Sequence, residues 1–470
     1  MRLTVDDLLK VRHAEVHHRE LLEKRTITGI STDTRSLKSG DLFFALKGEN
    51  FDGHAFVESA FEKGASAAVV EGSFAHARFL SVPLLVVENA TRALGELAHL
   101  YRKRFSIPVI AIGGSNGKTT TKDMITKVLA SSYTVLSTDG NHNNHIGVPL
   151  TLFRLEKKHE MAVVEVGTNH PGEIEHLVHL LDPTDGLITN IGHEHLEFFK
   201  SLDGVAEEEG TLFRQLKSRK RAQLFVNADD TRVKAIAGRT KNRWTYGFDS
   251  RAVDVAGRII GVDKKGASRF EFRSKSMKRS VSVQLKVPGR HNAVNAIAAA
   301  AVGVAFDVPA ARIRKALECF HPSDKRMEVL KVGGVTIYND TYNANPDSMI
   351  AALHTLAAAR VSGKKIAVLA DMLELGELAP EEHERVGREA AKLGVGYMLT
   401  FGEHAKHIHG AARVSSAIHY DQKNILAEYL AELVAPGDAV LVKGSRGMKM
   451  EDVITFLVER LRHAPAEFSS

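Results

Sequence analysis

The sequence predicts an α/β protein of three domains: a small α/β domain at the N-terminus, a central domain with a parallel sheet, and a C-terminal Rossmann-like, doubly wound domain. Two observations lead to this prediction. The chain has 470 residues, which is more than one hydrophobic core usually serves. Along most of its length, short apolar runs alternate with amphipathic helical segments, a pattern typical of parallel sheets covered by helices.

Residues 1–106 are predicted to form the N-terminal domain. The runs 41–46 ("DLFFAL"), 67–70 ("AAVV") and 83–87 ("PLLVV") are its predicted strands, with helical segments between them. The stretch 89–105 predicts a helix that leads to Pro108, and a proline after a helix favours a domain boundary.

Residues 107–321 are predicted to form the central domain. Near-continuous β-branched runs between its helices indicate a parallel sheet with both faces covered. Residues 253–288 have instead the pattern of antiparallel strands, and the alanine-rich helix 291–306 follows them. The predicted strands of the parallel part are 109–114 ("VIAIGG"), 133–137 ("YTVLS"), 161–167 ("MAVVEVG"), 185–192 ("DGLITNIG") and 222–227 ("AQLFVN").

Residues 322–470 show a third alternation of strands and helices, which predicts a smaller doubly wound domain. Helical segments such as 380–394 ("PEEHERVGREAAKLG") separate its apolar runs. The predicted strands are 335–340 ("VTIYND"), 365–371 ("KIAVLAD"), 395–401 ("VGYMLTF") and 438–444 ("DAVLVKG"). Two α/β domains in series favour ligands bound between them.

The composition is that of an ordinary globular protein, with 44% hydrophobic and 26% charged residues. The net charge of +6 comes without a long basic run, so a nucleic-acid partner is not expected. The densest basic cluster, 217–221, is predicted to be a solvated helix end. A diffuse positive charge suits small anionic substrates equally well.

Membrane insertion and secretion are not expected. The first ten residues carry acidic side chains where a signal peptide needs an apolar core. The longest apolar stretch, "AIAAAAVGVAF", is too short to span a bilayer. The single Cys319 cannot form an internal disulfide, which favours a reducing cytoplasm.

The stretch "AIGGSNGKTTTKDM" predicts a phosphate-binding loop between a strand and a helix, although its glycines are shifted from the usual spacing. Gly114 and Gly117 let backbone N–H groups approach phosphate oxygens, and a helix N-terminus adds a partial positive charge. Lys118 would reach the β- and γ-phosphates of ATP, and the Thr119 hydroxyl could bind Mg²⁺.

A magnesium ion also needs a carboxylate. Glu165 ends a predicted apolar strand at the carboxyl edge of the sheet, where such a charge is costly unless it is paired or bound to a metal. In "HEHLE", His193, His195 and Glu197 would share one side if the segment were extended. A second magnesium ligand, a surface histidine and a zinc site all remain open from the spacing, with zinc the least favoured because nothing completes a tetrahedron.

Long stretches of the chain resemble the Mur ligases, ATP-dependent amide-forming enzymes of peptidoglycan precursor synthesis. The loop "GSNGKT" has the glycine spacing of that family. Further stretches that carry the resemblance are "STDTRSLKSGDLFFALKGENFDGHAF", "NHNNHIGVPLTL", "EVGTNHPGEIEHL", "TNIGHEHLEFF" and "GRHNAVNAIAAAA". "YNDTYNANPDSMIAAL", "LADMLELGE" and "VLVKGSRGMKMED" narrow it to the branch that joins D-alanyl-D-alanine to a UDP-N-acetylmuramoyl tripeptide.

The resemblance implies roles for particular residues. The UDP end of the substrate is assigned to the N-terminal domain, at Ser31, Thr32 and Arg35, although "STDTR" also suits an ordinary turn. The muramoyl-peptide part is assigned to Asn144, Thr168 and Asn169, with Asn343 and Asn345 also near the substrate. The residues assigned to ATP are Gly114, Ser115, Asn116, Gly117, Lys118, Thr119, Thr120, Asn292, Asn295, Arg326 and Asp340.

By the same resemblance, the catalytic residues are Lys118, Glu165, His195 and Arg326. Magnesium is assigned to Thr119, Glu165, His195 and Glu209. Two alternatives remain: Asn292 could be a helix cap, and Arg326 and Asp340 could form a surface ion pair.

Glu209 stands where several members of the family have a lysine that is carbamylated and bridges to magnesium. A glutamate could supply the same negative oxygens without added CO₂. The acidic run 207–209 could instead be a solvated helix face.

The resemblance implies transfer of the γ-phosphoryl group of ATP to the tripeptide carboxylate, followed by attack of the D-alanyl-D-alanine amine. We expect a monomer whose third domain closes over ATP and the substrate. Two alternatives remain open: a related ligase with another amine acceptor, such as an amino-acid-adding or folylpolyglutamate-like enzyme, and an ATP-driven switch.

Overall fold

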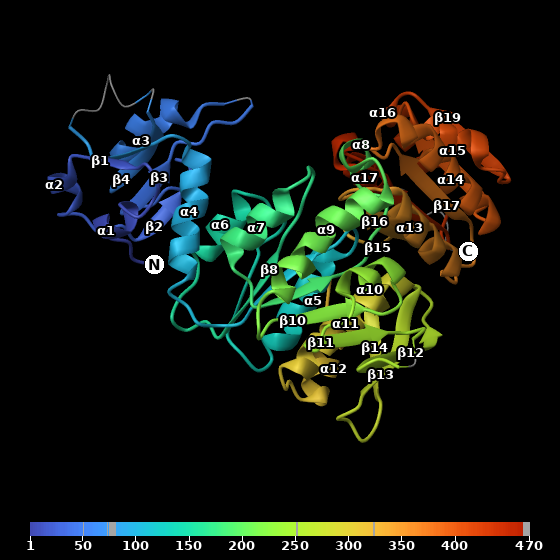
Figure 1. The fold of residues 1–470 in the computed structure, drawn as a ribbon. Helices are drawn as coiled ribbons and strands as arrows, with labels where there is room; N and C mark the ends of the chain where they lie inside the picture. Colours follow the sequence, from blue (N-terminus) through green and yellow to red (C-terminus); the bar gives the residue numbers. More distant parts are fainter. Residues whose placement is uncertain (50, 73, 75–80, 251, 323–324, 464–470) are drawn as a thin grey trace. The chain divides into compact units, whose positions relative to one another are not determined.

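The computed structural model describes residues 1–49, 51–72, 74, 81–250, 252–322 and 325–463 (Figure 1). The chain forms two compact units. The first comprises residues 1–111, 133–168 and 172–186, and the second comprises residues 112–132, 169–171 and 187–470.

The first unit contains a five-stranded sheet with the order β1-β5-β4-β3-β2. Four of its strands are parallel, and β1 pairs antiparallel with β5 at the edge. The strands are β1 (Glu15–His17), β2 (Gly29–Ser31), β3 (Asp41–Phe44), β4 (Ala67–Glu71) and β5 (Leu84–Val87). The apolar runs predict β3, β4 and β5, whereas the short β1 and β2 have no such signal.

Helices accompany this sheet, and α4 packs on β3 and β4. Asn89 caps α4, because its side chain accepts a hydrogen bond from the Arg92 N–H at 2.8 Å. The helices of the first unit are α1 (Val5–Leu8), α2 (Arg19–Leu22), η1 (Gly53–Phe56), α3 (Val57–Glu62), α4 (Ala90–Arg102), α6 (Gly147–Leu152) and α7 (Glu173–Leu181).

The largest sheet has nine strands in the order β14-β13-β12-β11-β10-β9-β6-β8-β7. The pairs β7–β8, β10–β11 and β11–β12 are parallel, and β12, β13 and β14 form an antiparallel end. Its strands are β6 (Val109–Gly113), β7 (Val135–Ser137), β8 (Met161–Glu165), β9 (Asp185–Ile188), β10 (Gln223–Asn227), β11 (Arg243–Gly247), β12 (Val255–Val262), β13 (Ala267–Ser274) and β14 (Val281–Pro288).

In the second unit, the buried helix α11 packs against α5 and against β11 to β13. After Asn295 it consists only of Ala, Ile, Val and Gly, which suits a helix buried in a core. The helices of this part are α5 (Lys118–Leu129), α8 (Leu196–Phe199), α9 (Leu202–Lys217), α10 (Thr231–Ala237), α11 (Arg290–Ala305) and α12 (Ala310–Glu318).

The second unit also contains a six-stranded sheet with the order β15-β16-β20-β17-β18-β19. All pairs are parallel except β15–β16. The strands are β15 (Glu328–Val332), β16 (Val335–Asp340), β17 (Lys365–Ala370), β18 (Tyr397–Phe401), β19 (Ser416–Tyr420) and β20 (Ala439–Lys443). The helices are α13 (Pro346–Ala358), η2 (Gly376–Leu378), α14 (Ala379–Lys392), α15 (Ala405–Ala411), α16 (Lys423–Leu433), η3 (Arg446–Met448) and α17 (Glu451–His463).

Both faces of this six-stranded sheet are buried, which confirms the predicted doubly wound arrangement. Leu369 of β17 belongs to a core with residues of α13, α14 and α15. Its neighbour Val368 belongs to a second core with residues of α16 and α17. Successive side chains of a strand point to opposite faces, so the continuous apolar run of β17 fills both cores.

Candidate active site

The predicted phosphate loop lies between β6 and α5. Gly114 has φ of 108°, and a Cβ at this position would lie 2.4 Å from Thr189 Oγ1. Gly117 has φ of 79° and is the N-cap of α5. Only glycine suits both positions, because each combines a left-handed backbone with close neighbours. The loop therefore brings backbone N–H groups and a helix N-terminus to one place.

Lys118 lies folded against its own loop. Its Nζ donates to the Gly114 carbonyl at 2.5 Å and to the Ser115 carbonyl at 3.3 Å. It also lies 3.4 Å from Glu194 Oε2, and both side chains are largely buried. The ammonium group is thus held near the phosphate-binding N–H groups, with a buried carboxylate as counter-charge.

Glu209 of α9 is fully buried beside this lysine. Its Oε2 accepts a hydrogen bond from the Gly114 N–H at 2.6 Å. Burial raises the pKa of Glu209 to about 7; the Lys118 ammonium opposes this rise and the Glu194 charge adds to it. A solvated helix face is therefore wrong for Glu209, although Glu207 in the same run is exposed.

Two buried carboxylate oxygens at this loop lack a hydrogen-bond partner among the described residues. They are Oε1 of Glu194 and Oε1 of Glu209. Buried acceptors are nearly always satisfied in native proteins, so an unsatisfied pair beside a phosphate loop indicates a place for a cationic ligand.

The segment 190–195 follows β9 and runs beside the phosphate loop. Asn190 exchanges two hydrogen bonds with the Asn116 backbone, at 3.1 and 2.8 Å. The Gly192 N–H donates to Ser115 Oγ at 2.8 Å. The loop and this segment are therefore one hydrogen-bonded structure.

His193 and His195 do not share a side, so the extended arrangement is wrong. His195 has φ of 49° and is the N-cap of α8, which turns Glu197 outward to solvent. His195 Nδ1 lies 2.6 Å from Glu374 Oε2, whereas His193 Nδ1 lies 3.0 Å from Asp347 Oδ2. The left-handed residue breaks the two-residue alternation on which the prediction depended.

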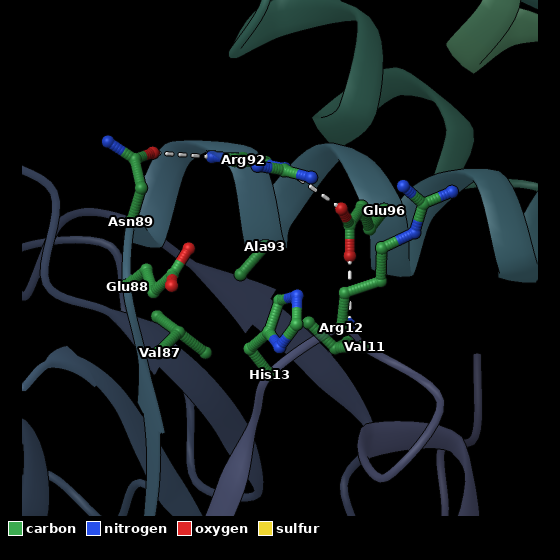
Figure 2. A pocket seen from close by; sticks show the side chains of 9 residues that line it. All are labelled: Val11, Arg12, His13, Val87, Glu88, Asn89, Arg92, Ala93 and Glu96. Atoms are coloured by element: carbon green, nitrogen blue, oxygen red, sulfur yellow. Dashed lines mark hydrogen bonds and ion pairs between the residues drawn. The ribbon is translucent and has the colours of Figure 1, made fainter.

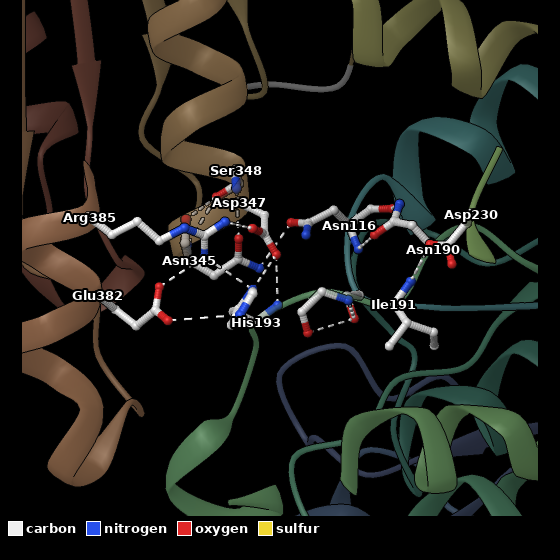
Figure 3. Close-up of polar contacts among 12 residues, drawn as sticks. Asn116, Asn190, Ile191, His193, Asp230, Asn345, Asp347, Ser348, Glu382 and Arg385 are labelled. Atoms are coloured by element: carbon white, nitrogen blue, oxygen red, sulfur yellow. Dashed lines mark hydrogen bonds and ion pairs between the residues drawn. The ribbon is translucent and has the colours of Figure 1, made fainter. Parts of the chain in front are cut away.

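Asp347, in the first turn of α13, is the centre of a charged cluster (Figure 3). Its Oδ2 accepts from the His193 N–H at 2.7 Å, and its Oδ1 accepts from Arg385 Nη2 at 2.8 Å. Burial favours a higher pKa for Asp347, but the hydrogen bonds from His193 and the charges of His193 and Arg385 outweigh it and lower the pKa to about 2. The carboxylate is therefore ionised at neutral pH.

Family models for the Mur ligases match three stretches of the chain. The Mur ligase family catalytic domain matches residues 26–110, the Mur ligase middle domain matches residues 112–303, and the Mur ligase glutamate ligase domain matches residues 325–446. The chain belongs to the Mur ligase family.

Two relatives match this Mur ligase over nearly its whole length. The UDP-N-acetylmuramoyl-tripeptide--D-alanyl-D-alanine ligase of Bacillus subtilis is 36% identical over 445 residues, covering 93% of this chain and 94% of the relative. The enzyme of the same name from Escherichia coli is 35% identical over 463 residues, covering 97% of this chain and 98% of the relative.

Solved structures of MurF are similar in fold as well. A crystal structure of MurF from Acinetobacter baumannii has a TM-score of 0.88 and 31% identity, and covers 98% of this chain and 99% of that one. MurF ligase from Thermotoga maritima, solved in complex with ADP, has a TM-score of 0.81 and 28% identity over 94% of this chain and 99% of that one.

Among the other residues predicted to contact ATP, Asn295 lies next to the loop. A Cβ on Gly117 would lie 2.6 Å from Asn295 Oδ1. Asn292 lies inside α11, where its side chain donates to the Pro288 carbonyl at 2.7 Å, and the helix begins after Gly289 without a side-chain cap. Helix capping by Asn292 is therefore wrong. Both asparagines are buried.

Arg326 and Asp340 do not form an ion pair with each other. The Arg326 guanidinium lies 3.7 Å from the centre of the Tyr342 ring. Asp340 Oδ2 accepts instead from Lys443 Nζ at 2.6 Å, and this lysine is almost fully buried. The alternative of a surface pair is therefore wrong.

Asn343 and Asn345 belong to the segment between β16 and α13. The Asn343 carbonyl accepts from Lys443 Nζ at 2.9 Å. Asn345 caps α13 and donates through Nδ2 to Asn116 Oδ1 of the phosphate loop at 2.9 Å. The start of α13 is thus hydrogen-bonded directly to the loop.

Glu165 ends β8 in the first unit, as predicted. It is buried, and its Oε1 accepts from Asn143 Nδ2 at 2.8 Å. Within the described ranges, no group of three or more His, Cys, Asp and Glu residues is close enough to hold a metal. The assignment of Thr119, Glu165, His195 and Glu209 to magnesium stays a prediction.

The residues predicted for the UDP end lie at the end of β2 and in the turn that follows it. The Ser31 hydroxyl donates to the Asp33 carbonyl at 2.9 Å. Arg35 is exposed and donates to both Asp33 carboxylate oxygens; this pairing lowers the pKa of Asp33 to about 2. Thr32 is half-buried beside them. The observed contacts are those of a polar turn, and substrate binding here stays a prediction.

The remaining predicted substrate residues have varied surroundings. Asn144 Oδ1 accepts from the N–H groups of Ile146 and Gly147, which cap α6. Thr168 is buried and Asn169 is exposed. Their substrate roles stay predictions.

A pocket in the first unit lies between the segment before β1 and the start of α4 (Figure 2). Its volume of about 10 Å³ has room for a single water molecule. Glu96 accepts from the Arg12 N–H and from Arg92 on its wall. It is too small for a nucleotide, and none of the predicted substrate residues lines it.

The sequence interpretation missed three charged residues of the site. Lys443 had a usable signal, because it is a charge at the end of an apolar run, whereas Glu194 stands between two histidines and had none. Asp347 had none, since an acidic residue in the first turn of a helix is common.

Proposed function

We propose that this Mur ligase joins D-alanyl-D-alanine to the terminal carboxylate of a UDP-N-acetylmuramoyl tripeptide at the expense of ATP. The observation that carries the proposal is the phosphate loop, with Lys118 held beside the buried carboxylate of Glu194. The proposal is supported by near full-length similarity to the UDP-N-acetylmuramoyl-tripeptide--D-alanyl-D-alanine ligases of Bacillus subtilis and Escherichia coli and to a MurF ligase solved with ADP. Cytoplasmic location and a monomeric state stay predictions.

The reaction needs activation, because joining a carboxylate to an amine in water is uphill. A carboxylate oxygen of the tripeptide attacks the γ-phosphorus of ATP, and ADP leaves. The amine of D-alanyl-D-alanine then attacks the acyl phosphate carbonyl, loses a proton and displaces phosphate. Such a site works mainly by positioning the reactants and neutralising charge.

The chain supplies groups for each of these tasks. The N–H groups at the start of α5 and the Lys118 ammonium are placed to bind the phosphates. Arg326 would neutralise the transferring phosphoryl group, and Asp340 would bind the nucleotide. Exclusion of water would protect the acyl phosphate, which hydrolyses readily.

Magnesium is the cofactor we propose, because the donor set at the loop fits a hard cation. Glu194 and Glu209 each have a buried oxygen with no hydrogen-bond partner in the described part of the chain. Thr119, His195 and Glu209 of the second unit are its proposed protein ligands; Glu165, which the resemblance also assigns to magnesium, belongs to the first unit. Bound magnesium would supply charge neutralisation of the phosphates.

Glu209 is proposed to replace the carbamylated lysine of related enzymes. The burial of this carboxylate supports the proposal, because burying an acid is costly and a residue on a solvated helix face would not be buried. We expect Glu209→Lys to retain activity only with added bicarbonate, and Glu209→Ala to lose it. Full activity of Glu209→Ala in phosphate release would contradict this role.

The function is tested by phosphate release from ATP with UDP-N-acetylmuramoyl tripeptide, with and without D-alanyl-D-alanine. Mass spectrometry follows the UDP-linked product. We expect release to need both substrates and the product to gain one dipeptide. Product with another amine acceptor only would favour a different amide ligase, and release without any acceptor would favour an ATP-driven switch.

A further inference from the structure

The segment 190–193 is held at every residue by a different group. Asn190 bonds to the backbone of Asn116, and the Ile191 N–H donates to Asp230 Oδ2 at 3.0 Å. The Gly192 N–H donates to Ser115 Oγ, and the His193 N–H donates to Asp347 Oδ2. Three of these four contacts are to the central part of the second unit, and the fourth is to α13.

Asp347 is the group that fixes the last of these residues. Its Oδ2 lies 2.7 Å from the His193 backbone nitrogen and 3.0 Å from His193 Nδ1. Arg385 of α14 holds the other carboxylate oxygen at 2.8 Å and also donates to Glu382 at 3.0 Å. The carboxylate is thus oriented from one side by α14 and bonded on the other to the segment beside the phosphate loop.

Gly192 is where these parts meet most closely. A Cβ at this residue would lie 2.6 Å from Asp347 Oδ2, 3.2 Å from Asn116 Nδ2 and 3.5 Å from Ser115 Cβ. The absence of a side chain therefore lets Asp347 approach the phosphate loop. Asn345, two residues before Asp347, adds a direct hydrogen bond to Asn116.

We propose that Asp347 is a positioning residue for nucleotide binding, acting through the segment 190–194 on the phosphate loop. The segment holds Ser115 and Asn116 by hydrogen bonds and carries Glu194 to Lys118. Without the carboxylate, His193 loses its hydrogen bonds to Asp347, and the backbone N–H groups of the phosphate loop are held less firmly in position. This inference rests on the proposed function in one respect, that the nucleotide is ATP.

The test compares Asp347→Ala, Asp347→Asn and Arg385→Gln in the full chain. We expect Asp347→Ala to weaken ADP binding in calorimetry, and to raise KM for ATP, by about tenfold to a hundredfold, because small misplacements of binding groups cost that much. Asp347→Asn keeps an acceptor for the His193 N–H and should lose less. Binding of UDP-N-acetylmuramoyl tripeptide should stay near wild type in all three. The lost ion pairs should lower the melting temperature, so ADP binding is compared at a temperature at which every variant is folded.

A matched control is Glu384→Gln, which breaks the exposed Glu384–Arg388 ion pair on the same α14. We expect no change in ADP binding. Equal weakening in this control, or wild-type ADP binding by a folded Asp347→Ala protein, would overturn the inference.

Gly192→Ala supplies a second, independent test. The added methyl group should weaken ADP binding in the wild-type background and much less in Asp347→Ala, where the carboxylate it meets is gone. Strictly additive effects would overturn the inference. ADP binding is measured without the acceptor, so a protein that fails to make the pentapeptide but shows this pattern would refute the proposed function and leave the inference standing.

Discussion

Two buried polar clusters of the second unit differ in how fully their polar atoms are hydrogen-bonded. In the six-stranded sheet, Asp371 accepts from the N–H groups of His404 and Ala405 at 3.0 and 2.7 Å. Nearby, His383 Nε2 accepts from the Met372 N–H at 3.0 Å, and its Nδ1 lies 2.6 Å from the Ala379 carbonyl. At the phosphate loop, Glu194 and Glu209 each keep an oxygen with no hydrogen-bond partner among the described residues.

This difference distinguishes buried groups that stabilise the fold from buried groups that could bind a ligand. Satisfied buried groups such as Asp371 and His383 fix loops at the carboxyl edge of the sheet, because every donor finds its acceptor. Unsatisfied buried carboxylates are costly unless a cation binds to them. Substitutions at the loop should therefore change activity, and substitutions in the sheet should change stability.

The largest expected effect is that of Lys118→Ala. Removing the ammonium group should lower ATP-dependent phosphate release by about a thousandfold, since a charge aimed at the phosphates is lost. Lys127→Ala, on the same helix, is the matched control, because Lys127 donates to the Cys319 carbonyl instead. Similar losses in both variants would contradict a specific role for Lys118.

Glu209→Gln should lower activity and, at high pH, raise stability. Activity should fall by about tenfold or more, and the magnesium requirement should rise. Folding raises the pKa of Glu209 from 4.5 to about 7, so wild-type stability falls as the pH rises from about 4.5 to about 7 and levels off above that. The variant should therefore be more stable than wild type at pH 8, by at most about 3 kcal/mol, and lose this advantage toward pH 4.5. Denaturant titrations at both pH values measure it; lower stability at pH 8 would contradict it.

His383→Gln should change stability and leave kcat close to wild type. Burial lowers the pKa of His383 from 6.5 to about 4, so the folded state resists protonation and loses stability as the pH falls below 6.5. This one group should cost wild type about 2 kcal/mol between pH 7 and pH 5. The variant should be less stable at pH 7 and show a flatter profile. An unchanged profile would mean that His383 does not titrate with folding.

Arg388→Ala should have the smallest effect. The Arg388–Glu384 pair is half exposed on α14, and such pairs contribute about 0.5 kcal/mol or less. Thermal unfolding with and without 0.5 M salt (about 4 Å of screening length) should show little difference from wild type. A large loss of stability would show that this face of α14 is covered in a way the ion pair does not reveal.

The strands that the sequence predicts are those with strong apolar runs, such as β4, β8, β17 and β20. β1, β11, β15 and β19 had no comparable signal: β15 and β19 are edge strands with half-exposed residues, and β1 has only three residues. Edge strands bury little apolar surface, so few of their residues need to be apolar and their sequence pattern is weak. The antiparallel direction of β1 likewise depends on β5, a partner distant in the chain, whereas β15 pairs with β16 across the short turn at Gly333 and Gly334.

The sequence by itself determined the phosphate loop and its chemistry, because the strand, the glycines and the lysine lie within a few consecutive residues and act locally. Only the tertiary structure decided which charges surround that loop. Glu209 meets Gly114 across 95 residues, and Asp347 meets His193 across 154. The physical reason is that burial and pairing, which set the charge and the role of a carboxylate, are properties of the packed neighbours and not of the adjacent residues.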